Sequence, residues 1–285
     1  MKVVTIATDL ENTFLRRLLV PSCHAFGMDL VVLNPKTSPF GLADKRAALA
    51  GYLSTVRDSD ELVLFTDGYD ALFIRDERHI MAAYASFSEP VVFSAEVNPW
   101  PLGIVGLALH DGPPVGRFPY LNSGGFIGPA RMLHALITRY PEPPTGRFEL
   151  LRQLRAHGYD TDRRFGWSDQ YHWTLVRLLE RETTGVDHDA RLFECYAPPV
   201  PDVNFREIMR EVEDFRARGR ESDSYQRERT RLAERLQVPS GAAHIHFASP
   251  VTKAVAEDLL HEGQLPGWLI GHLSTAMPPA QVLPV

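Results

Sequence analysis

Two aspartates, Asp67 and Asp70, lie on either side of Gly68-Tyr69, just after Thr66 and the predicted strand 61–65. Two carboxylates on one tight turn offer the hard oxygen ligands that Mg²⁺ and Mn²⁺ prefer. Such an ion can bridge a diphosphate and neutralise the charge that develops on a departing nucleoside diphosphate. A phosphatase of the haloacid dehalogenase type also has an aspartate after a strand, but it needs two aspartates two positions apart. Here they are three apart, so the spacing does not fit this type of phosphatase. From the pair of carboxylates we predict a divalent-cation site.

Further polar residues that could take part in the same chemistry follow along the chain. Glu96 and Trp100 share one loop after the apolar run 91–94. The glycine-rich stretch 121–128 contains Asn122 and would allow close backbone approach to a ligand, or a tight bend. These residues are candidates for contacts to a sugar.

Asp169 and His246 lie in less specific surroundings. Asp169 stands at a predicted helix start, where an N-cap is the simplest explanation for an aspartate. His246 lies in a strand-like stretch, where a histidine is more often a core or surface residue than a metal ligand. Neither residue would indicate a site on its own.

The elements that must position these residues alternate along the first hundred residues. The pattern predicts strands at 3–7, 30–33, 61–65 and 91–94, and helices at 13–25, 43–56 and 75–87. This order indicates an α/β fold with a Rossmann-like, mostly parallel sheet and helices on both faces. Ligands bind such sheets at the carboxyl ends of the strands, so we expect Asp67, Asp70 and Glu96 to lie close together.

The remainder of the chain is predicted to complete a single domain over residues 1–285. Further helices are expected at 130–139, 148–157 and 169–180. The predicted segments are a nucleotide-binding half at 1–120, a sugar and acceptor half at 121–197, a charged helical excursion at 198–240, and a C-terminal strand and helix at 241–285. Within the excursion we expect helix over 205–236, with a break around 219–224 and a charged, solvent-exposed face. The Pro-rich tail after Ala276 is expected to be irregular.

The composition excludes several classes of protein. The 285 residues are 44% hydrophobic and 23% charged, with a net charge of -6, which gives no general attraction to nucleic acid or anionic lipid. Cys23 and Cys195 have no metal-ligand spacing. The N-terminus is unlike a signal peptide, and no apolar run approaches the roughly 20 residues of a membrane helix. We therefore expect a soluble, cytoplasmic protein without membrane or nucleic-acid partners.

Four motifs in order carry a family resemblance. They are Thr66-Asp67-Gly68-Tyr69-Asp70, Phe93-Ser94-Ala95-Glu96 with Trp100-Pro101, Leu121-Asn122-Ser123-Gly124-Gly125-Phe126-Ile127-Gly128, and Asp169-Gln170. Together they resemble the glycosyltransferase domain of the procollagen lysyl hydroxylase and procollagen glycosyltransferase family. The resemblance runs from about residue 3 to about 195 and resumes at 246–253. It implies a GT-A fold that uses UDP-sugars with Mn²⁺.

The resemblance also implies a function for each matched position. Asp67, Asp70 and His246 would bind Mn²⁺ or Mg²⁺, and either Asp169 or Glu96 would be the catalytic carboxylate. The donor UDP-sugar would be contacted by Thr8, Lys45, Asp67, Tyr69, Asp70, Trp100, Asn122, Gly124, Gly125 and Lys253. Within this set, Tyr69 would stack on uracil, Trp100 would border the sugar or act as a gate, and Lys253 would pair with the diphosphate.

We therefore predict a metal-dependent transferase that moves a hexose from a UDP-sugar to a peptide or small-molecule acceptor. UDP-glucose or UDP-galactose is the favoured donor, and collagen is not the expected acceptor because no hydroxylase domain follows. One alternative is a non-catalytic nucleotide-sugar-binding module, favoured by Ser168 where the family has an acid. A sugar nucleotidyltransferase is less consistent with the sequence, because such enzymes usually have a Gly-rich phosphate loop after the first strand. Here that stretch is Thr8-Asp9-Leu10-Glu11-Asn12, which lacks glycine.

Overall fold

A central seven-stranded sheet organises the computed structural model, which describes residues 1–36, 38–59, 61–110, 115–200, 205–273 and 280–285. In spatial order its strands are β10 (Gln281–Pro284), β2 (Asp29–Asn34), β1 (Lys2–Ile6), β3 (Leu62–Asp67), β6 (Tyr120–Pro129), β5 (Val91–Glu96) and β7 (Thr184–Val186). Strand β6 is antiparallel to both neighbours, whereas the remaining neighbouring pairs are parallel. The predicted mostly parallel α/β sheet is confirmed.

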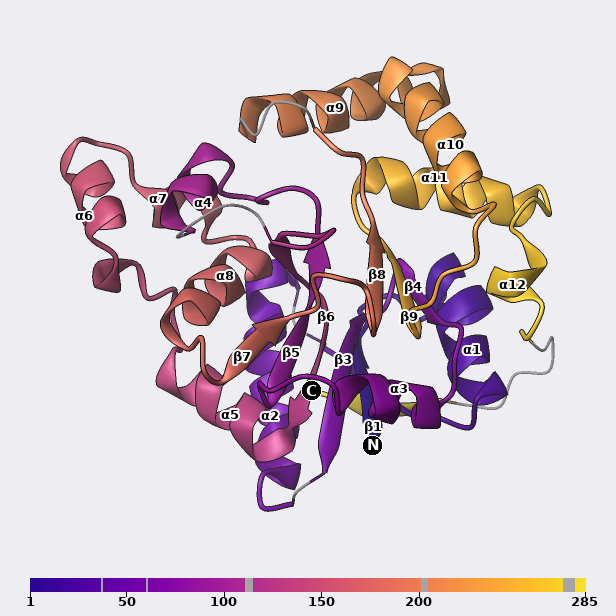
Figure 1. Cartoon of the computed structure of the whole chain (residues 1–285), viewed down its shortest axis with the longest axis horizontal. Coiled ribbons are helices and arrows are strands. Elements are labelled where there is room, and N and C mark those ends of the chain that lie inside the picture. The colour runs from indigo at the N-terminus through magenta and orange to yellow at the C-terminus, as the bar shows by residue number, and fades with distance from the viewer. Residues whose placement is uncertain (37, 60, 111–114, 201–204, 274–279) are drawn as a thin grey trace.

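Both faces of this sheet are apolar because residues along its strands alternate between two cores. On one face, Val4 and Phe65 pack with α2 (Lys45–Val56), α5 (Ala130–Arg139) and α8 (Asp169–Leu179). The second face, to which Val3 and Leu64 contribute, packs against three helices and part of a second sheet. The helices are the π-helix η1 (Leu15–Leu19), α1 (Val20–Ala25) and α3 (Glu77–Tyr84). Helices therefore cover both faces, as Figure 1 shows.

The second sheet is small but supplies part of the site. It consists of β4 (Ala71–Phe73), β9 (His244–Phe247) and β8 (Phe193–Tyr196), with β9 in the middle. Strand β4 follows β3 after a short turn, so the second sheet begins where the central strand ends. The turn between β3 and β4 therefore lies at the junction of the two sheets (Figure 1).

The glycine-rich stretch 121–128, whose composition allowed close backbone approach to a ligand or a tight bend, is a strand. It forms most of β6, which lies between β3 and β5 and changes register between Phe93 and Ser94 of β5. Phe126 of this strand stacks on Phe65, with ring centroids 4.8 Å apart. Aromatic packing and hydrogen bonding to a strand on each side, β3 and β5, outweigh the low strand propensity of glycine.

The C-terminal tail also differs from the expectation of an irregular segment. Residues 280–285 are described, and Gln281–Pro284 form β10, which pairs in parallel with β2. Part of the predicted tail, residues 277–279, lies outside the described residues. Pro284 is the last residue of an edge strand, where its missing N–H removes no ladder hydrogen bond.

The charged excursion forms α9 (Phe205–Arg218), the short 3₁₀-helix η4 (Gly219–Glu221) and α10 (Asp223–Arg235), so the predicted break is confirmed. It is less solvated than its composition suggests. Tyr225 and Leu232 of α10 are buried in one core with α11 (Pro250–His261). Tyr225 also donates to Asp258 of α11 at 2.5 Å, and Thr252 donates to Glu228 at 2.5 Å. One face of the excursion is therefore packed against the rest of the chain.

The other described helices are short: η2 (Leu42–Asp44), α4 (Ile104–Leu109), η3 (Thr145–Arg147), α6 (Glu149–Ala156), α7 (Thr161–Phe165) and α12 (Gly267–Ile270). None of the described helices is long and apolar enough to cross a membrane.

Candidate active site

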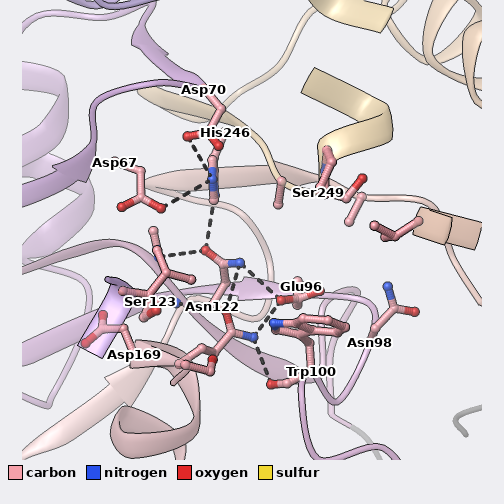
Figure 2. Close-up of a pocket in the computed structure, with 18 of the residues that line it drawn as sticks. Asp67, Asp70, Glu96, Asn98, Trp100, Asn122, Ser123, Asp169, His246 and Ser249 are labelled. Atoms are coloured by element: carbon pink, nitrogen blue, oxygen red, sulfur yellow. Dashed lines mark hydrogen bonds and ion pairs between the residues drawn. The ribbon is translucent and has the colours of Figure 1, made fainter. Parts of the chain in front are cut away.

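Asp67, Asp70 and His246 come together at the junction of the two sheets (Figure 2). Asp67 ends β3, Asp70 precedes β4, and the antiparallel register pairs Ala71 with His246 of β9. His246 Nε2 lies 3.4 Å from Asp70 Oδ1 and 3.9 Å from Asp67 Oδ2. The three ligand atoms lie within 4.8 Å of one another. The pairing of β4 with β9 thus brings His246 next to two aspartates that lie far away from it in the sequence.

Gly68 allows the turn between the aspartates to pack closely on β1. A Cβ at this position would lie 2.8 Å from Thr5 Oγ1 and 3.2 Å from the Ile6 carbonyl oxygen. Thr5 Oγ1 in turn donates to the Thr66 carbonyl at 2.8 Å. The glycine between the two acids is therefore required by the close approach of β1.

The hydrogen bonds of Asn122 determine which nitrogen of His246 faces the aspartates. Asn122 Nδ2 donates to Glu96 Oε1 at 3.1 Å, and Oδ1 accepts from the Gly124 N–H at 2.9 Å. Asn122 Oδ1 is therefore an acceptor, and His246 Nδ1, 3.1 Å away, must donate to it. This leaves Nε2 directed toward the carboxylates, the arrangement in which a second residue orients a metal-binding imidazole.

Charge within the cluster is balanced without a metal. Burial opposes ionisation of Asp70, but the nearby charges of His246, Lys253 and Lys45 lower its pKa. Burial also opposes protonation of His246, but Asp70 raises the pKa of this imidazole well above its usual range. Lys45 forms an ion pair with Asp67. A cation is thus held beside each carboxylate.

The cluster also fits a divalent cation. Asp70 Oδ1 is buried and makes no hydrogen bond, so one ligand oxygen is left without a donor. Two carboxylates with one imidazole form a donor set suited to Mn²⁺, and Mg²⁺ prefers the oxygen ligands. These three residues could therefore hold a cation that replaces the proton of His246 Nε2.

Glu96 is held in place by two amides. Its Oε1 accepts from Gln170 Nε2 at 2.6 Å and from Asn122 Nδ2 at 3.1 Å. Gln170 Nε2 also donates to the Trp100 carbonyl at 3.1 Å, which fixes the loop after β5. Burial raises the pKa of Glu96. Its hydrogen bonds make this carboxyl an anchor for the side chains around it.

Asp169 has a different environment, although it lies next to Gln170. Ser168, and not Asp169, is the N-cap of α8, because Ser168 Oγ accepts from the Tyr171 N–H. Asp169 Oδ1 is buried without a hydrogen bond, 3.5 Å from Nη1 of Arg46 on α2. Burial raises the pKa of Asp169 to about 6, although Lys45 and Arg46 lower it. Asp169 is therefore available to exchange a proton near neutral pH.

These groups line a cavity of about 730 Å³. Most predicted site residues contribute to it: Lys45, Asp67, Asp70, Glu96, Trp100, Asn122, Gly124, Asp169 and His246. Figure 2 shows Asp67 and Asp70 beside His246, and Asn122 linked to both His246 and Glu96. The sequence interpretation did not identify Arg46, although this side chain pairs with Asp169. No spacing rule links residue 46 to residue 169, so only the fold reveals the pair.

Four predicted donor contacts do not line this cavity: Thr8, Tyr69, Gly125 and Lys253. Three of them form a neighbouring group. Thr8 Oγ1 lies 3.2 Å from Tyr69 Oη, and Lys253 Nζ lies 5.2 Å from the centre of the Tyr69 ring. Gly125 lies apart from this group, because a Cβ there would meet Phe193 at 2.9 Å. Gly125 therefore faces a packed aromatic side chain.

The excursion contributes to the cavity, which its charged composition did not indicate. Met209, Val212 and Arg216 of α9 line it together with Glu211. The three residues Met209, Val212 and Arg216 are spaced by three and then four positions, so they share one face of the helix. Helical spacing could have suggested this face, but not that it borders the site.

Gly124→Ala is expected to displace His246. The new Cβ would lie 2.2 Å from His246 Cε1, far inside van der Waals contact, and β6 and β9 are both paired. We expect Mn²⁺ affinity to fall at least ~10-fold and the free energy of unfolding to fall by about 1–3 kcal/mol. Calorimetric Mn²⁺ titration and thermal unfolding measure the two effects.

Gly51→Ala is the matched control, because nothing lies within 4 Å of the added Cβ on α2. It should leave Mn²⁺ affinity unchanged and increase stability by roughly 0.5–1 kcal/mol. Wild-type Mn²⁺ affinity in Gly124→Ala would contradict the placement of His246 as a ligand.

Comparisons with known proteins agree with the motifs. A family model described as "PLOD GT domain" matches residues 1–143. Procollagen-lysine,2-oxoglutarate 5-dioxygenase 1 of Pongo abelii is 30% identical over 207 residues, 67% of this chain and 25% of that protein. The Homo sapiens multifunctional procollagen lysine hydroxylase and glycosyltransferase LH3 is 29% identical over 140 residues, 47% of this chain and 16% of that protein. The chain thus matches a quarter or less of the length of these relatives.

A solved structure of a glycosyltransferase involved in the glycosylation of the major capsid of PBCV-1 has a TM-score of 0.41 and 10% sequence identity. That alignment covers 90% of this chain and 97% of that chain.

Proposed function

Since the chain belongs to the PLOD glycosyltransferase-domain family, we propose that it transfers a hexose from a UDP-sugar to an acceptor hydroxyl with the help of a divalent cation. One observation carries the proposal. Asp67, Asp70 and His246 converge at the wall of a cavity of about 730 Å³ that also contains Asp169. This arrangement combines a metal-binding set with a carboxyl that titrates near neutral pH.

Asp67, Asp70 and His246 would hold Mn²⁺ or Mg²⁺. When bound, the cation supplies positive charge that stabilises the leaving diphosphate. Asn122 keeps the His246 imidazole oriented, and Lys45, already paired with Asp67, adds a positive charge beside the same position. The protein thereby places cationic groups where negative charge develops, which is the main source of catalysis in such sites.

The nucleoside of the donor would lie toward Thr8 and Tyr69. Tyr69 presents an aromatic ring next to the metal-binding turn, and Lys253 Nζ lies 5.2 Å from the centre of that ring. A uracil base could stack on this ring, and Lys253 could meet the diphosphate. The hexose would then enter the cavity near Asn122 and Asp169.

Asp169 would accept the proton of the acceptor hydroxyl. The hydroxyl oxygen forms a bond to the anomeric carbon, the bond from that carbon to the diphosphate oxygen breaks, and UDP leaves with the electron pair. Asp169 has a buried oxygen without a hydrogen bond, whereas Glu96 Oε1 already accepts from two amides. The geometry therefore supports Asp169 over Glu96 as the base.

The finer assignments belong to the same proposal. UDP-glucose or UDP-galactose is the proposed donor, Mn²⁺ the proposed cation, and a peptide or small molecule the proposed acceptor. A cytoplasmic location remains a prediction. Ser168, the residue that favoured a non-catalytic binding module, is the N-cap of α8, which gives this serine a structural role.

The test is incubation with a panel of UDP-sugars and Mn²⁺, with UDP release as the measurement. We expect release from a UDP-hexose, and its loss on addition of EDTA. The proposal would be contradicted if no donor released UDP and if EDTA did not change UDP binding. Metal-dependent binding of UDP-sugars without release would instead support the binding-module alternative.

A further inference from the structure

One part of the cavity lining comes from α9 and from residues 164–167 and is called the outer part below. Its composition is not explained by the metal and donor groups. Trp167 and Arg164 line it from the segment around α7, and Met209, Val212 and Arg216 line it from α9. Alanine and proline residues after β8 and β9 also contribute. Donor chemistry uses the acids and His246, so these apolar and cationic groups are left for the second substrate.

The positive charge at this end is not neutralised. Among the described residues, neither Arg164 nor Arg216 has a carboxylate partner, and the guanidinium of Arg164 lies 4.3 Å from the centre of the Tyr159 ring. Glu211, the acid on the same helix that lines the cavity, is already paired with Arg227 of α10 at 2.7 Å. Within the described part of the chain, the outer part therefore presents two arginines without a carboxylate partner, beside one acid that already pairs with Arg227.

The apolar residues of the outer part suit a ligand with a flat body. Trp167 is 45% exposed, which is unusual for so large an apolar side chain, and its ring packs edge to face against Trp100 at 5.9 Å between centroids. Its indole N–H donates to the Arg164 carbonyl at 2.8 Å, which holds the ring in place. An exposed aromatic ring with a fixed orientation is a stacking surface for a ligand.

We propose that α9 and the Trp167 segment form the acceptor subsite, and that the acceptor is an alcohol or phenol with a flat apolar body and a negatively charged group. The body would lie between Trp167 and the Met209–Val212 face of α9, and the anion would pair with Arg164 and Arg216. This inference rests on the proposed function. It assigns the excursion, which lies outside the 1–143 family match, to acceptor selection.

Charge-matched probes test the inference. We would use 4-hydroxyphenylacetate, 4-hydroxyphenylacetamide and tyramine, which share one ring and differ in charge, and measure binding calorimetrically with UDP and Mn²⁺ present. We expect the anion to bind roughly 10-fold more tightly than the amide, because a charge-assisted hydrogen bond to arginine is lost in the amide. Tyramine should bind most weakly.

Arg164→Gln and Arg216→Gln should each reduce the preference for the anion, and Arg216→Lys should retain part of it. Arg163→Gln is the matched control, because Arg163 is the neighbouring arginine on α7 and does not line the cavity. Equal binding of the three probes, no binding of any probe, or an unchanged preference in the Arg164→Gln, Arg216→Gln double variant would overturn the inference.

UDP affinity in the presence of Mn²⁺, measured with the wild-type protein, separates this inference from the proposed function. If UDP binds and the probes show no charge preference, the acceptor inference alone fails. If UDP does not bind with Mn²⁺, the proposed function fails, whatever the probes do.

Discussion

Asp70→Asn is expected to reduce metal-dependent release of UDP from a UDP-sugar by roughly 100-fold or more. The change replaces one of the two carboxylates at the proposed metal site by an isosteric amide. Asp70 Oδ1 is buried, has no hydrogen bond, and lies 3.4 Å from His246 Nε2. A metal supplies several kcal/mol of charge stabilisation, and about 2.7 kcal/mol corresponds to 100-fold in rate. Steady-state UDP release against Mn²⁺ concentration measures the loss.

Asp58→Asn provides the control for this substitution, because the Asp58 side chain is 97% exposed and does not line the cavity. It should behave as the wild type. Full activity of Asp70→Asn at low Mn²⁺ would show that Asp70 does not hold the metal. The transferase assignment would survive that result, because UDP release would still occur.

Asp169→Asn is expected to lower the transfer rate by roughly 10²–10⁴-fold, the usual contribution of a general base. UDP binding should be retained, because the metal-binding residues remain. The same variant should be more stable than the wild type at pH 8, since it removes a buried charge. Transfer kinetics and chemical denaturation in EDTA measure the two effects.

The stability difference should depend on pH in a defined direction. The pKa of Asp169 in the folded protein is about 6, above the ordinary 3.8. Between these values the folded state binds more protons than the unfolded state, so this carboxyl makes the wild type lose stability as the pH rises from 4 to 6. This upward shift of the pKa corresponds to a loss of about 3 kcal/mol in the free energy of unfolding at pH 7 and above. The advantage of Asp169→Asn should therefore disappear near pH 4.

Glu96→Gln distinguishes the two candidate carboxylates. Glu96 Oε1 accepts from two amides, so a glutamine there should disturb the positions of Asn122 and Gln170. Burial also raises the pKa of Glu96, so Glu96→Gln should remove that carboxyl's own contribution to the pH dependence of stability and leave the contribution of Asp169 between pH 4 and 6. If the contribution between pH 4 and 6 were lost in Glu96→Gln and kept in Asp169→Asn, the titration assigned to Asp169 would be wrong.

Local patterns were sufficient for most of the fold. The predicted helix at 130–139 coincides with α5, and the predicted strands at 30–33 and 91–94 lie within β2 and β5. The family resemblance was also confirmed, by the match over residues 1–143. Both successes depend on information carried by neighbouring residues, namely apolar periodicity and short motifs.

The failures involve residues whose conformation depends on distant partners. Glycine-rich β6 becomes a strand because β3 and β5 lie on either side of it. The tail forms β10 only because β2 offers it an edge. Pairing across the sheet supplies the stabilisation that propensity lacks, and no local pattern reports it.

The candidate site likewise combines residues that the sequence identified with residues that only the fold reveals. Sequence motifs identified Asp67, Asp70 and His246, and the structure brings their ligand atoms within 4.8 Å. Sequence did not reveal that Arg46 pairs with Asp169, or that α9 lines the cavity. Gly124, predicted to contact the donor, lines the cavity, and its missing side chain also makes room for His246, which the sequence did not indicate.

The pairing of β10 with β2 makes one edge of the central sheet depend on residues far away in the sequence. Gln281 pairs with Val31 and Leu283 with Leu33, so β10 must fold back onto a strand from the other end of the domain. Before this contact forms, β2 presents an unpaired ladder with the apolar residues Leu30–Leu33, the kind of edge that templates association between chains. Docking of β10 therefore covers an apolar strand edge that would otherwise promote aggregation. Contacts this distant in sequence are also the slowest to form.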